Sequence, residues 1–315
     1  MRCLVTGGSG FIGGHVARRF HEGGHEVMVV DTRWTADDPF PGQAASVSDR
    51  DVIAELFDSW RPDVVMHLAG VADARAVLAD PVTAMDINVT GTASVLAAAA
   101  ATGVSRVVIA GSCWVYNAMP VEAVDEDEPF LPSGAGHPYT TSMIAKELLA
   151  RDFARLHGLE STVLRYSPVY GPGMWPGLVV SAFLRAAAAG GALTVFGDGT
   201  ERRAFLHVHD LAEAFYRATA PVGANQVYNL EGPDILTTAE LAHKVSDLFG
   251  GVPVEYREEP TRRGELVYSQ RLVSTRKARE QLGWTPRVGI DEGLRAELAA
   301  AGGARGTDGA KVAGR

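Results

Sequence analysis

The stretch MRCLVTGGSGFIGGHVARRF, residues 1–20, decides the fold. A short apolar run, Arg2–Val5, leads directly into a glycine-rich turn, which is followed by a segment of helical periodicity, Ile12–Glu22. Glycines permit a tight turn and let the backbone approach a pyrophosphate, which then lies at the N-terminus of the following helix. The order of strand, turn and helix therefore predicts a dinucleotide-binding unit. Its expected contact residues are Gly7, Gly10, Phe11, Ile12 and Gly13.

Asp31 directly follows the next strand-like run, Glu26–Val30. It lies at about the 20-residue spacing at which such units place an acidic residue on the ribose of the adenosine. A carboxylate there accepts hydrogen bonds from the ribose hydroxyls and repels a 2′-phosphate. Asp31 therefore predicts NAD as the cofactor, whereas Arg33, two residues further on, would favour NADP.

Bulk composition narrows the classes of function. The 315 residues carry a formal net charge of −9, which disfavours a nucleic-acid partner. Only two cysteines are present, Cys3 and Cys113, so a disulfide framework is not indicated. The N-terminus runs straight into a strand, and glycine or charged residues interrupt each apolar run. We therefore expect a cytoplasmic protein with no membrane span and no metal-ligand cluster.

Strand-like runs alternate with helix-period segments over the first half of the chain, which predicts an α/β fold of the Rossmann type, a doubly wound parallel sheet. The expected strands are Arg2–Val5, Glu26–Val30, Asp63–His67, Arg106–Ala110 and Ser161–Tyr166. The expected helices are Ile12–Glu22, Asp51–Trp60, Val82–Thr102, Thr141–His157, Ala239–Phe249 and Ser274–Leu282.

This alternation of strands and helices predicts three regions of the chain. Residues 1–172 form the expected NAD-binding domain, and residues 173–300 mainly a smaller substrate lobe, with some segments returning to the sheet. Residues 301–315 are small, polar and aperiodic, so we expect a disordered tail. The acidic run Asp125–Glu128 is expected to be a solvated loop.

With the motif TGGSGFIG, the chain resembles the extended short-chain dehydrogenase/reductase family, and within it the NAD-dependent nucleotide-sugar epimerase/dehydratase branch. The resemblance runs from Met1 to about Gly293. It includes LRYSPVYGPG at 164–173, similar to the substrate-loop signature of the family, and LGWTP at 282–286, similar to a C-terminal marker.

The resemblance implies a role for individual residues. Tyr139 matches the catalytic tyrosine and Ser112 the catalytic serine or threonine, which would also contact the substrate. Further cofactor contacts implied are Leu68, Ala69, Gly70, Asn88 and Tyr139 itself. Further substrate contacts implied are Pro168, Val169, Arg203 and Arg262, the two arginines holding a diphosphate. The expected partners are a nucleotide-diphosphate sugar and a second copy of the chain in a homodimer.

The sequence departs from the family at the catalytic helix. Met143 stands four residues after Tyr139, where the family has a lysine that stabilises the tyrosine anion. Methionine carries no charge and donates no hydrogen bond. Lys146, seven residues after Tyr139, lies on almost the same helical face and is the one replacement at hand. We expect Lys146 to be a solvated surface residue, with a displaced catalytic lysine as the alternative.

Two further departures bear on the reaction. Cys113 and Trp114 stand where sugar 4,6-dehydratases carry two acids, which argues against elimination of water. Pro168 replaces an asparagine that is common in the substrate loop.

The leading hypothesis is an NAD-dependent nucleotide-sugar epimerase that transiently oxidises a sugar hydroxyl with Tyr139 as base. The alternatives are an NAD(P)-dependent ketoreductase or dehydrogenase on a sugar or related carbonyl, and a degenerate NAD-binding regulatory protein.

Overall fold

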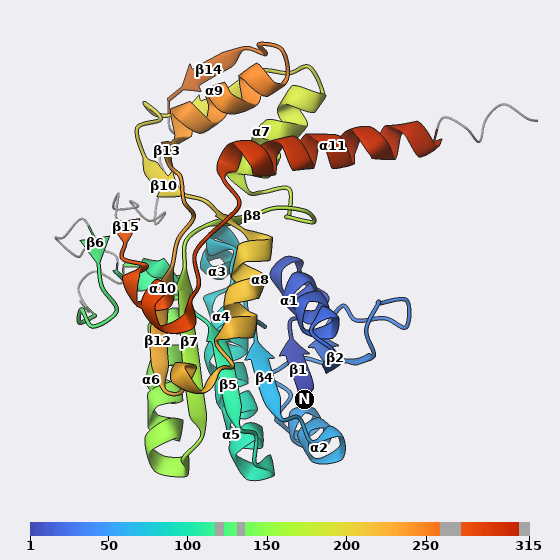
Figure 1. Cartoon of the computed structure of the whole chain (residues 1–315), viewed down its shortest axis with the longest axis vertical. Coiled ribbons are helices and arrows are strands. Elements are labelled where there is room, and N and C mark those ends of the chain that lie inside the picture. Colours follow the sequence, from blue (N-terminus) through green and yellow to red (C-terminus); the bar gives the residue numbers. More distant parts are fainter. Residues whose placement is uncertain (117–122, 131–135, 259–271, 309–315) are drawn as a thin grey trace, which may run out of the picture.

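The computed structural model describes residues 1–116, 123–130, 136–258 and 272–308, and within them seven parallel strands form one central sheet (Figure 1). The strand order is β12-β7-β5-β4-β1-β2-β3. The strands are β1 (Arg2–Thr6), β2 (Glu26–Asp31), β3 (Gly42–Ala44), β4 (Val64–His67), β5 (Arg106–Ala110), β7 (Glu160–Tyr166) and β12 (Gln226–Leu230). The predicted Rossmann-type α/β fold is confirmed.

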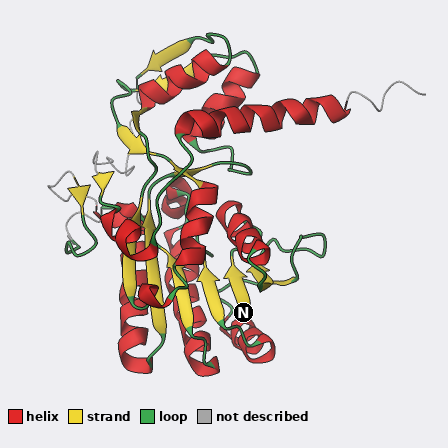
Figure 2. Cartoon of the chain, viewed as in Figure 1, coloured by secondary structure: helices red, strands yellow, loops and turns green. Residues whose placement is uncertain are grey.

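Helices cover both faces of the sheet, as Figure 2 shows, because the strands are apolar on both sides. One face packs against α1 (Phe11–Glu22) and α8 (Val208–Arg217), through Phe20 and Phe215. The other packs against α2 (Arg50–Trp60), α5 (Gly91–Thr102) and α6 (Pro138–His157). The sheet is therefore buried on both sides. Each face has its own apolar core, and the strands separate the two cores.

The order of the strands reverses direction at β1, which lies between β2 and β4. Thr6 of β1 pairs with Val30 of β2 on one side and with His67 of β4 on the other. In open parallel sheets, ligands bind in the crevice at such a reversal, beyond the carboxyl ends of the strands. The topology therefore places the glycine turn after β1 at the ligand-binding edge of the sheet.

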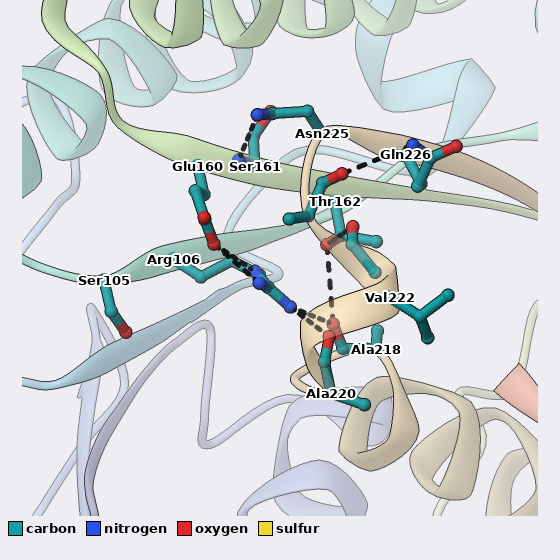
Figure 3. Close-up of polar contacts among 12 residues, drawn as sticks. Ser105, Arg106, Glu160, Ser161, Thr162, Ala218, Ala220, Val222, Asn225 and Gln226 are labelled. Carbon is teal, nitrogen blue, oxygen red and sulfur yellow. Dashed lines mark hydrogen bonds and ion pairs between the residues drawn. The ribbon is translucent and has the colours of Figure 1, made fainter.

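The chain leaves the central sheet after β7, passes through β8 (Val169–Tyr170), and returns to the sheet in α8 and β12, where Gln226–Leu230 pair with Thr162–Tyr166 of β7. Figure 3 shows how this return is fixed. The buried Arg106 guanidinium donates to the carbonyls of Ala218 and Ala220 at the end of α8, and it also bonds the Glu160 carboxylate at 2.6 Å. Thr162 donates its hydroxyl to the Gly223 carbonyl at 2.7 Å.

A second lobe, at the top of Figure 1, has its own apolar cluster, which includes Val180, Phe183, Val195, Leu241 and Leu294. It is formed by α7 (Val179–Ala188), β9 (Leu193–Phe196), α9 (Thr238–Leu248), β14 (Val254–Arg257) and α11 (Ile290–Asp308). The two-stranded pair β10 (Arg202–Ala204) and β13 (Ile235–Thr237) adjoins it. Further short elements are α3 (Ala74–Ala79), β6 (Ala123–Val124), β11 (Leu206–His207), β15 (Leu272–Val273) and α10 (Arg276–Leu282).

Two expectations about helices need correction. The segment from Val82 is not one regular helix: α4 (Pro81–Met85) and α5 are joined by a π-helical turn, Asp86–Thr90. The expected disorder from Ala301 is wrong as far as Asp308, because α11 continues to that residue; once a helix is nucleated, each further residue adds a backbone hydrogen bond. Residues 309–315 lie outside the described part of the chain.

By length and composition alone, the helical stretch Pro81–Thr102 is apolar enough to cross a membrane. Half of its apolar window is buried inside the protein, and α5 within it packs against the sheet between α2 and α6. Burial against the sheet accounts for its apolar composition, as in the core helix of a globular domain.

Candidate functional site

The glycine turn after β1 leaves no room for a side chain at Gly7 or Gly13. Gly7 has φ +73°, and a Cβ there would lie 2.8 Å from the Ala69 nitrogen. A Cβ on Gly13 would lie 2.0 Å from the Gly7 carbonyl oxygen. Gly10 is the N-cap of α1, and the side chain of no described residue caps the first turn. The N–H groups of that turn are therefore available to an anionic group.

Asp31 lies at the carboxyl end of β2, next to this turn. Its side chain is 9% exposed, and its Oδ1 accepts a 3.0 Å hydrogen bond from the Arg33 backbone N–H. The Arg33 Nε lies 3.5 Å from the same oxygen, and the arginine side chain as a whole is 69% exposed. The carboxylate is thus held at the strand end, and the Arg33 guanidinium extends from it to the glycine turn, where its Nη2 lies 3.5 Å from the position that a Cβ on Gly10 would take.

One cavity of about 710 Å³ runs along the carboxyl edge of the sheet and brings the predicted residues together. Its lining includes Gly7, Gly10, Phe11, Ile12, Gly13, Asp31, Leu68, Ala69, Gly70, Ser112, Tyr139, Pro168 and Val169. Asn88, Met143, Lys146 and Arg203 are not part of this lining. Arg262 lies outside the described residues. The volume is within the range of cofactor and small-molecule pockets.

Tyr139 and Ser112 form the polar pair at the end of the cavity away from Asp31. Tyr139 follows the N-cap His137, whose Nδ1 accepts from the Tyr139 backbone N–H at 3.0 Å. Burial raises the pKa of the Tyr139 phenol, a hydrogen bond with the Ser112 side chain lowers it, and the nearby Cys113 raises it. The Trp114 ring stands edge-on to the Tyr139 ring, with centroids 5.1 Å apart. The phenol is thus fixed in place beside a second hydroxyl.

Asn88 acts as a brace between the cofactor edge and α6. Its side chain exchanges two hydrogen bonds with the backbone of Val71, of 2.7 and 3.1 Å, and donates a third to the Ser142 hydroxyl at 3.0 Å. Ser142 in turn donates to the Tyr139 carbonyl at 2.7 Å. Asn88 therefore fixes the position of the helix that carries Tyr139.

Lys146 and Met143 are both buried in the interior side of α6. Met143 is 4% exposed and packs in an apolar cluster with Val115, Tyr116, Val124 and Val273. Lys146 is only 2% exposed, and burial lowers the pKa of its ammonium to about 8. The expectation that Lys146 is a solvated surface residue is therefore wrong. Its position faces the protein interior because α6 packs against the sheet and α5 along that side.

A buried network behind the cavity was missed by sequence reasoning. The Arg165 and Glu147 side chains are 0% exposed and form a two-point ion pair, with bonds of 2.9 and 2.7 Å. Arg165 also bonds the Tyr116 hydroxyl, which donates to Asn229 at 2.8 Å. The Asn229 backbone N–H donates to the Glu126 carboxylate at 2.8 Å. Glu126 is 7% exposed, so the expectation of a solvated acidic loop is wrong for that residue.

Comparison with known proteins assigns the family. The model of the "NAD dependent epimerase/dehydratase family" matches residues 3–230. This chain belongs to that family. It is 33% identical to a UDP-glucose 4-epimerase of Mycolicibacterium smegmatis, over 93% of this chain and 96% of the relative. It is 30% identical to a dTDP-glucose 4,6-dehydratase of Streptomyces niveus, over 93% of this chain and 90% of the relative.

Solved structures agree with the family assignment. The chain is similar to a UDP-glucose 4-epimerase of Thermus thermophilus in complex with NAD, with a TM-score of 0.86, 30% identity, and coverage of 96% of this chain and 100% of the other. The cofactor of the family is NAD, and the residues of this chain fit it: the glycine turn leaves room for a diphosphate, and Asp31 faces the same cavity. Its members and neighbours are sugar-nucleotide epimerases, dehydratases and related enzymes.

Several lining residues were not found from the sequence. Tyr166, Ser167, Trp175 and Leu178 also line the cavity. Ser167 is 4% exposed, and its hydroxyl has no hydrogen-bond partner in the described chain. Only the position of Ser167, directly before Pro168 in the substrate-loop signature, could have indicated from the sequence that it lines the cavity.

Proposed function

We propose that this protein is an NAD-dependent nucleotide-sugar epimerase that transiently oxidises a sugar hydroxyl, with Tyr139 as the base. The observation that carries the proposal is that the hydrogen-bonded side chains of Tyr139 and Ser112 line the same cavity as the glycine turn and Asp31. The UDP-glucose 4-epimerase names of the relatives support a UDP-sugar as the substrate class.

NAD, when bound, supplies the hydride acceptor. Gly7, Gly10 and Gly13 would hold its diphosphate at the N-terminus of α1, and Asp31 its adenosine ribose. In its ionised form, Tyr139 accepts the proton of the sugar hydroxyl at its phenolic oxygen, and Ser112 donates a hydrogen bond to the same sugar oxygen. Trp114 and Val169 line the cavity beside them and limit the access of water.

Epimerisation is favoured over elimination of water by the residues beside Ser112. A 4,6-dehydratase needs an acid and a base in addition to the tyrosine, whereas this chain has Cys113 and Trp114 there. Burial holds the pKa of the Cys113 thiol well above its usual value, and its sulfur donates to the Arg165 carbonyl at 3.5 Å. Neither residue is able to exchange a proton readily at neutral pH.

Two arginines complete the proposed substrate site. Arg203 on β10 bonds the Glu201 carboxylate at 2.8 Å, and Arg262 is proposed to act with it on the diphosphate. Guanidinium groups suit this role because they match phosphate oxygens at two points. Pro168 and Val169 would bound the sugar side of the same site.

The proposal includes a cytoplasmic homodimer. Val82 on α4 is 78% exposed, and Leu148 and Leu156 on α6 are 47% and 66% exposed. The two helices pack against each other, so their exposed apolar side chains support an interface with a second copy. Light scattering of the native chain and of L148E/L156E tests this: a dimer that becomes a monomer supports it, and a native monomer contradicts it.

The reaction is tested by incubating the purified protein, without added cofactor, with UDP-glucose or dTDP-glucose. We expect an isomeric product of unchanged mass, identified by NMR. A product lighter by one water would indicate a dehydratase, and net NADH would indicate a dehydrogenase. Bound NAD with no turnover of any sugar nucleotide would indicate a regulatory protein.

A further inference from the structure

We propose that Trp175 is a cofactor-binding residue whose indole contacts the bound dinucleotide and slows the release of NAD. The inference rests on NAD as the cofactor of the family, and it does not depend on the reaction that the protein catalyses. It gives a function to the segment that joins β8 to α7, residues 171–178, which the proposed mechanism does not use (Figure 1).

Trp175 is the most exposed of the five tryptophans, at 45%. It lines the same cavity as Gly10, Phe11 and Asp31. Tryptophan offers a large, flat apolar surface on which planar groups stack, and aromatic side chains are common in the lining of ligand pockets. NAD carries two planar rings, adenine and nicotinamide. An exposed indole in the lining of this cavity is therefore suited to contact the cofactor.

The segment around Trp175 is tied to the helix that begins at the glycine turn. His15 of α1 donates from its Nε2 to the Pro172 carbonyl at 2.8 Å. A Cβ on Gly173 would lie 4.0 Å from the Phe11 ring, and Phe11 is the first residue of α1. The segment therefore lies beside the turn that would hold the diphosphate of NAD.

The indole is held in place by its own segment. A Cβ on Gly177 would lie 2.0 Å from Cζ3 and 2.1 Å from Cη2 of Trp175, so the ring packs directly on the Gly177 backbone. The Leu178 N–H donates to the Trp175 carbonyl at 3.3 Å, just before α7 begins. A side chain that is already ordered loses less conformational freedom when it binds a ligand. Trp175 is thus preorganised at the cavity.

The residues that share the cavity favour NAD over the nucleotide sugar as the partner of Trp175. The indole lines it together with the glycine turn and Asp31. Arg203, the described arginine that is proposed to hold the sugar diphosphate, is not part of this lining. Trp175 therefore belongs to the part of the site that the cofactor would fill.

The deciding experiment measures the release of NAD in the absence of any sugar nucleotide. Protein loaded with isotopically labelled NAD is mixed with excess unlabelled NAD, and the retained label is followed over time. Trp175→Ala should release NAD about tenfold faster or more, because the loss of an aromatic contact acts mainly on the dissociation rate. Trp175→Phe keeps a flat apolar ring and should recover most of the retention. An unchanged release rate in Trp175→Ala would overturn the proposal.

Phe196→Ala is the matched control, because Phe196 on β9 is also 45% exposed but is not part of the cavity lining. It should release NAD at the native rate. Gly177→Ala displaces the indole without removing it, since the new methyl group would take the place of the outer edge of the ring. It should also speed the release of NAD. A native rate in Gly177→Ala would overturn the placement of the ring on which the proposal rests.

Oxidative footprinting tests whether the contact is direct. Hydroxyl radicals oxidise exposed aromatic side chains, and mass spectrometry of peptides locates the oxidised residues. Bound NAD should remove most of the oxidation at Trp175 and leave that at Phe196 unchanged. Protection of Trp175 by UDP-glucose but not by NAD would assign the indole to the sugar nucleotide and overturn the proposal. Protection by NAD in a protein that turns over no sugar nucleotide would support it and refute only the proposed reaction, so the two failures are distinguishable.

Discussion

The two ends of the cavity differ in how they hold a ligand. At the β2 end, fixed charges stand at the end of the strand and just after it, with the Arg33 Nε 3.5 Å from the Asp31 carboxylate. At the α6 end, the described lining consists of hydroxyls and aromatic rings, among them Ser112, Tyr139 and Trp114. The first end suits tight binding of a polar cofactor. The second holds neutral groups whose protons can move, and its charges, Lys146 and the Arg165–Glu147 pair, are buried behind the lining.

The largest effect is expected at the α6 end. Tyr139→Phe removes the base but leaves the glycine turn and Asp31 intact, so turnover should fall by about 10²–10⁴-fold while NAD binding is retained. Steady-state rates and calorimetry with NAD measure the two properties. Tyr256→Phe, on β14 and 51% exposed, is the control. Native turnover in Tyr139→Phe would remove Tyr139 from the mechanism.

The opposite pattern is expected at the β2 end. Asp31→Ala removes a charged hydrogen-bond acceptor for the ribose, a contribution of about 1.5–3 kcal/mol. NAD affinity should therefore fall about 10- to 100-fold, and the preference for NAD over NADP should narrow. Calorimetry with both dinucleotides gives the ratio. Equal affinities of the native protein for the two would contradict the assignment of Asp31.

A smaller effect is expected outside this cavity. Arg203→Ala should weaken binding of a UDP-sugar about tenfold, because one charged contact to the diphosphate is lost, and leave NAD affinity unchanged. Arg202→Ala, an exposed arginine on the same strand, is the control. If both variants bind the nucleotide sugar as the native protein does, the diphosphate lies elsewhere.

The smallest effect concerns stability behind the α6 end. Glu231 is 8% exposed, and burial raises the pKa of its carboxyl from 4.5 to about 8. The folded state thus favours the protonated acid, so this contribution to stability is present below pH 4.5 and lost as the pH rises to about 8. Glu231→Gln should raise Tm by a few degrees at pH 8 and little at pH 4.5.

Scanning calorimetry across that pH range measures the effect. The exposed Glu255, paired with Arg257, provides Glu255→Gln as the matched control. A parallel shift of Tm at all pH values in Glu231→Gln would show that packing, rather than the proton, is responsible.

The same contrast explains which parts of the site could be predicted from the sequence. The cofactor edge is encoded locally: Gly7, Gly13 and Asp31 follow strands that the apolar pattern reveals, and the structure brings them into one cavity. The α6 end depends on residues far apart in the sequence. Burial of Lys146 follows from packing of the whole helix, and Glu126 is buried because Asn229, 103 residues away, donates to it. Neither contact has a signature in a single sequence.

The return of α8 and β12 to the sheet was equally hard to locate. Segments were expected to return, but their bounds depend on distant partners such as Arg106, which bonds carbonyls at the end of α8. The helical periodicity of Val82–Thr102 likewise concealed the π-helical turn at Asp86–Thr90. That turn carries Asn88, whose contacts with Val71 and Ser142 become evident only in three dimensions.

The most direct test of the proposed epimerase is to run the reaction in deuterated water. Transient oxidation and reduction within one site returns the same hydrogen to the sugar carbon, so the inverted product should contain no carbon-bound deuterium, and no NADH should accumulate. NMR and mass spectrometry of the purified product measure both. Deuterium from the solvent at the inverted carbon would show that a proton, not a hydride, is exchanged, and would contradict the proposed reaction.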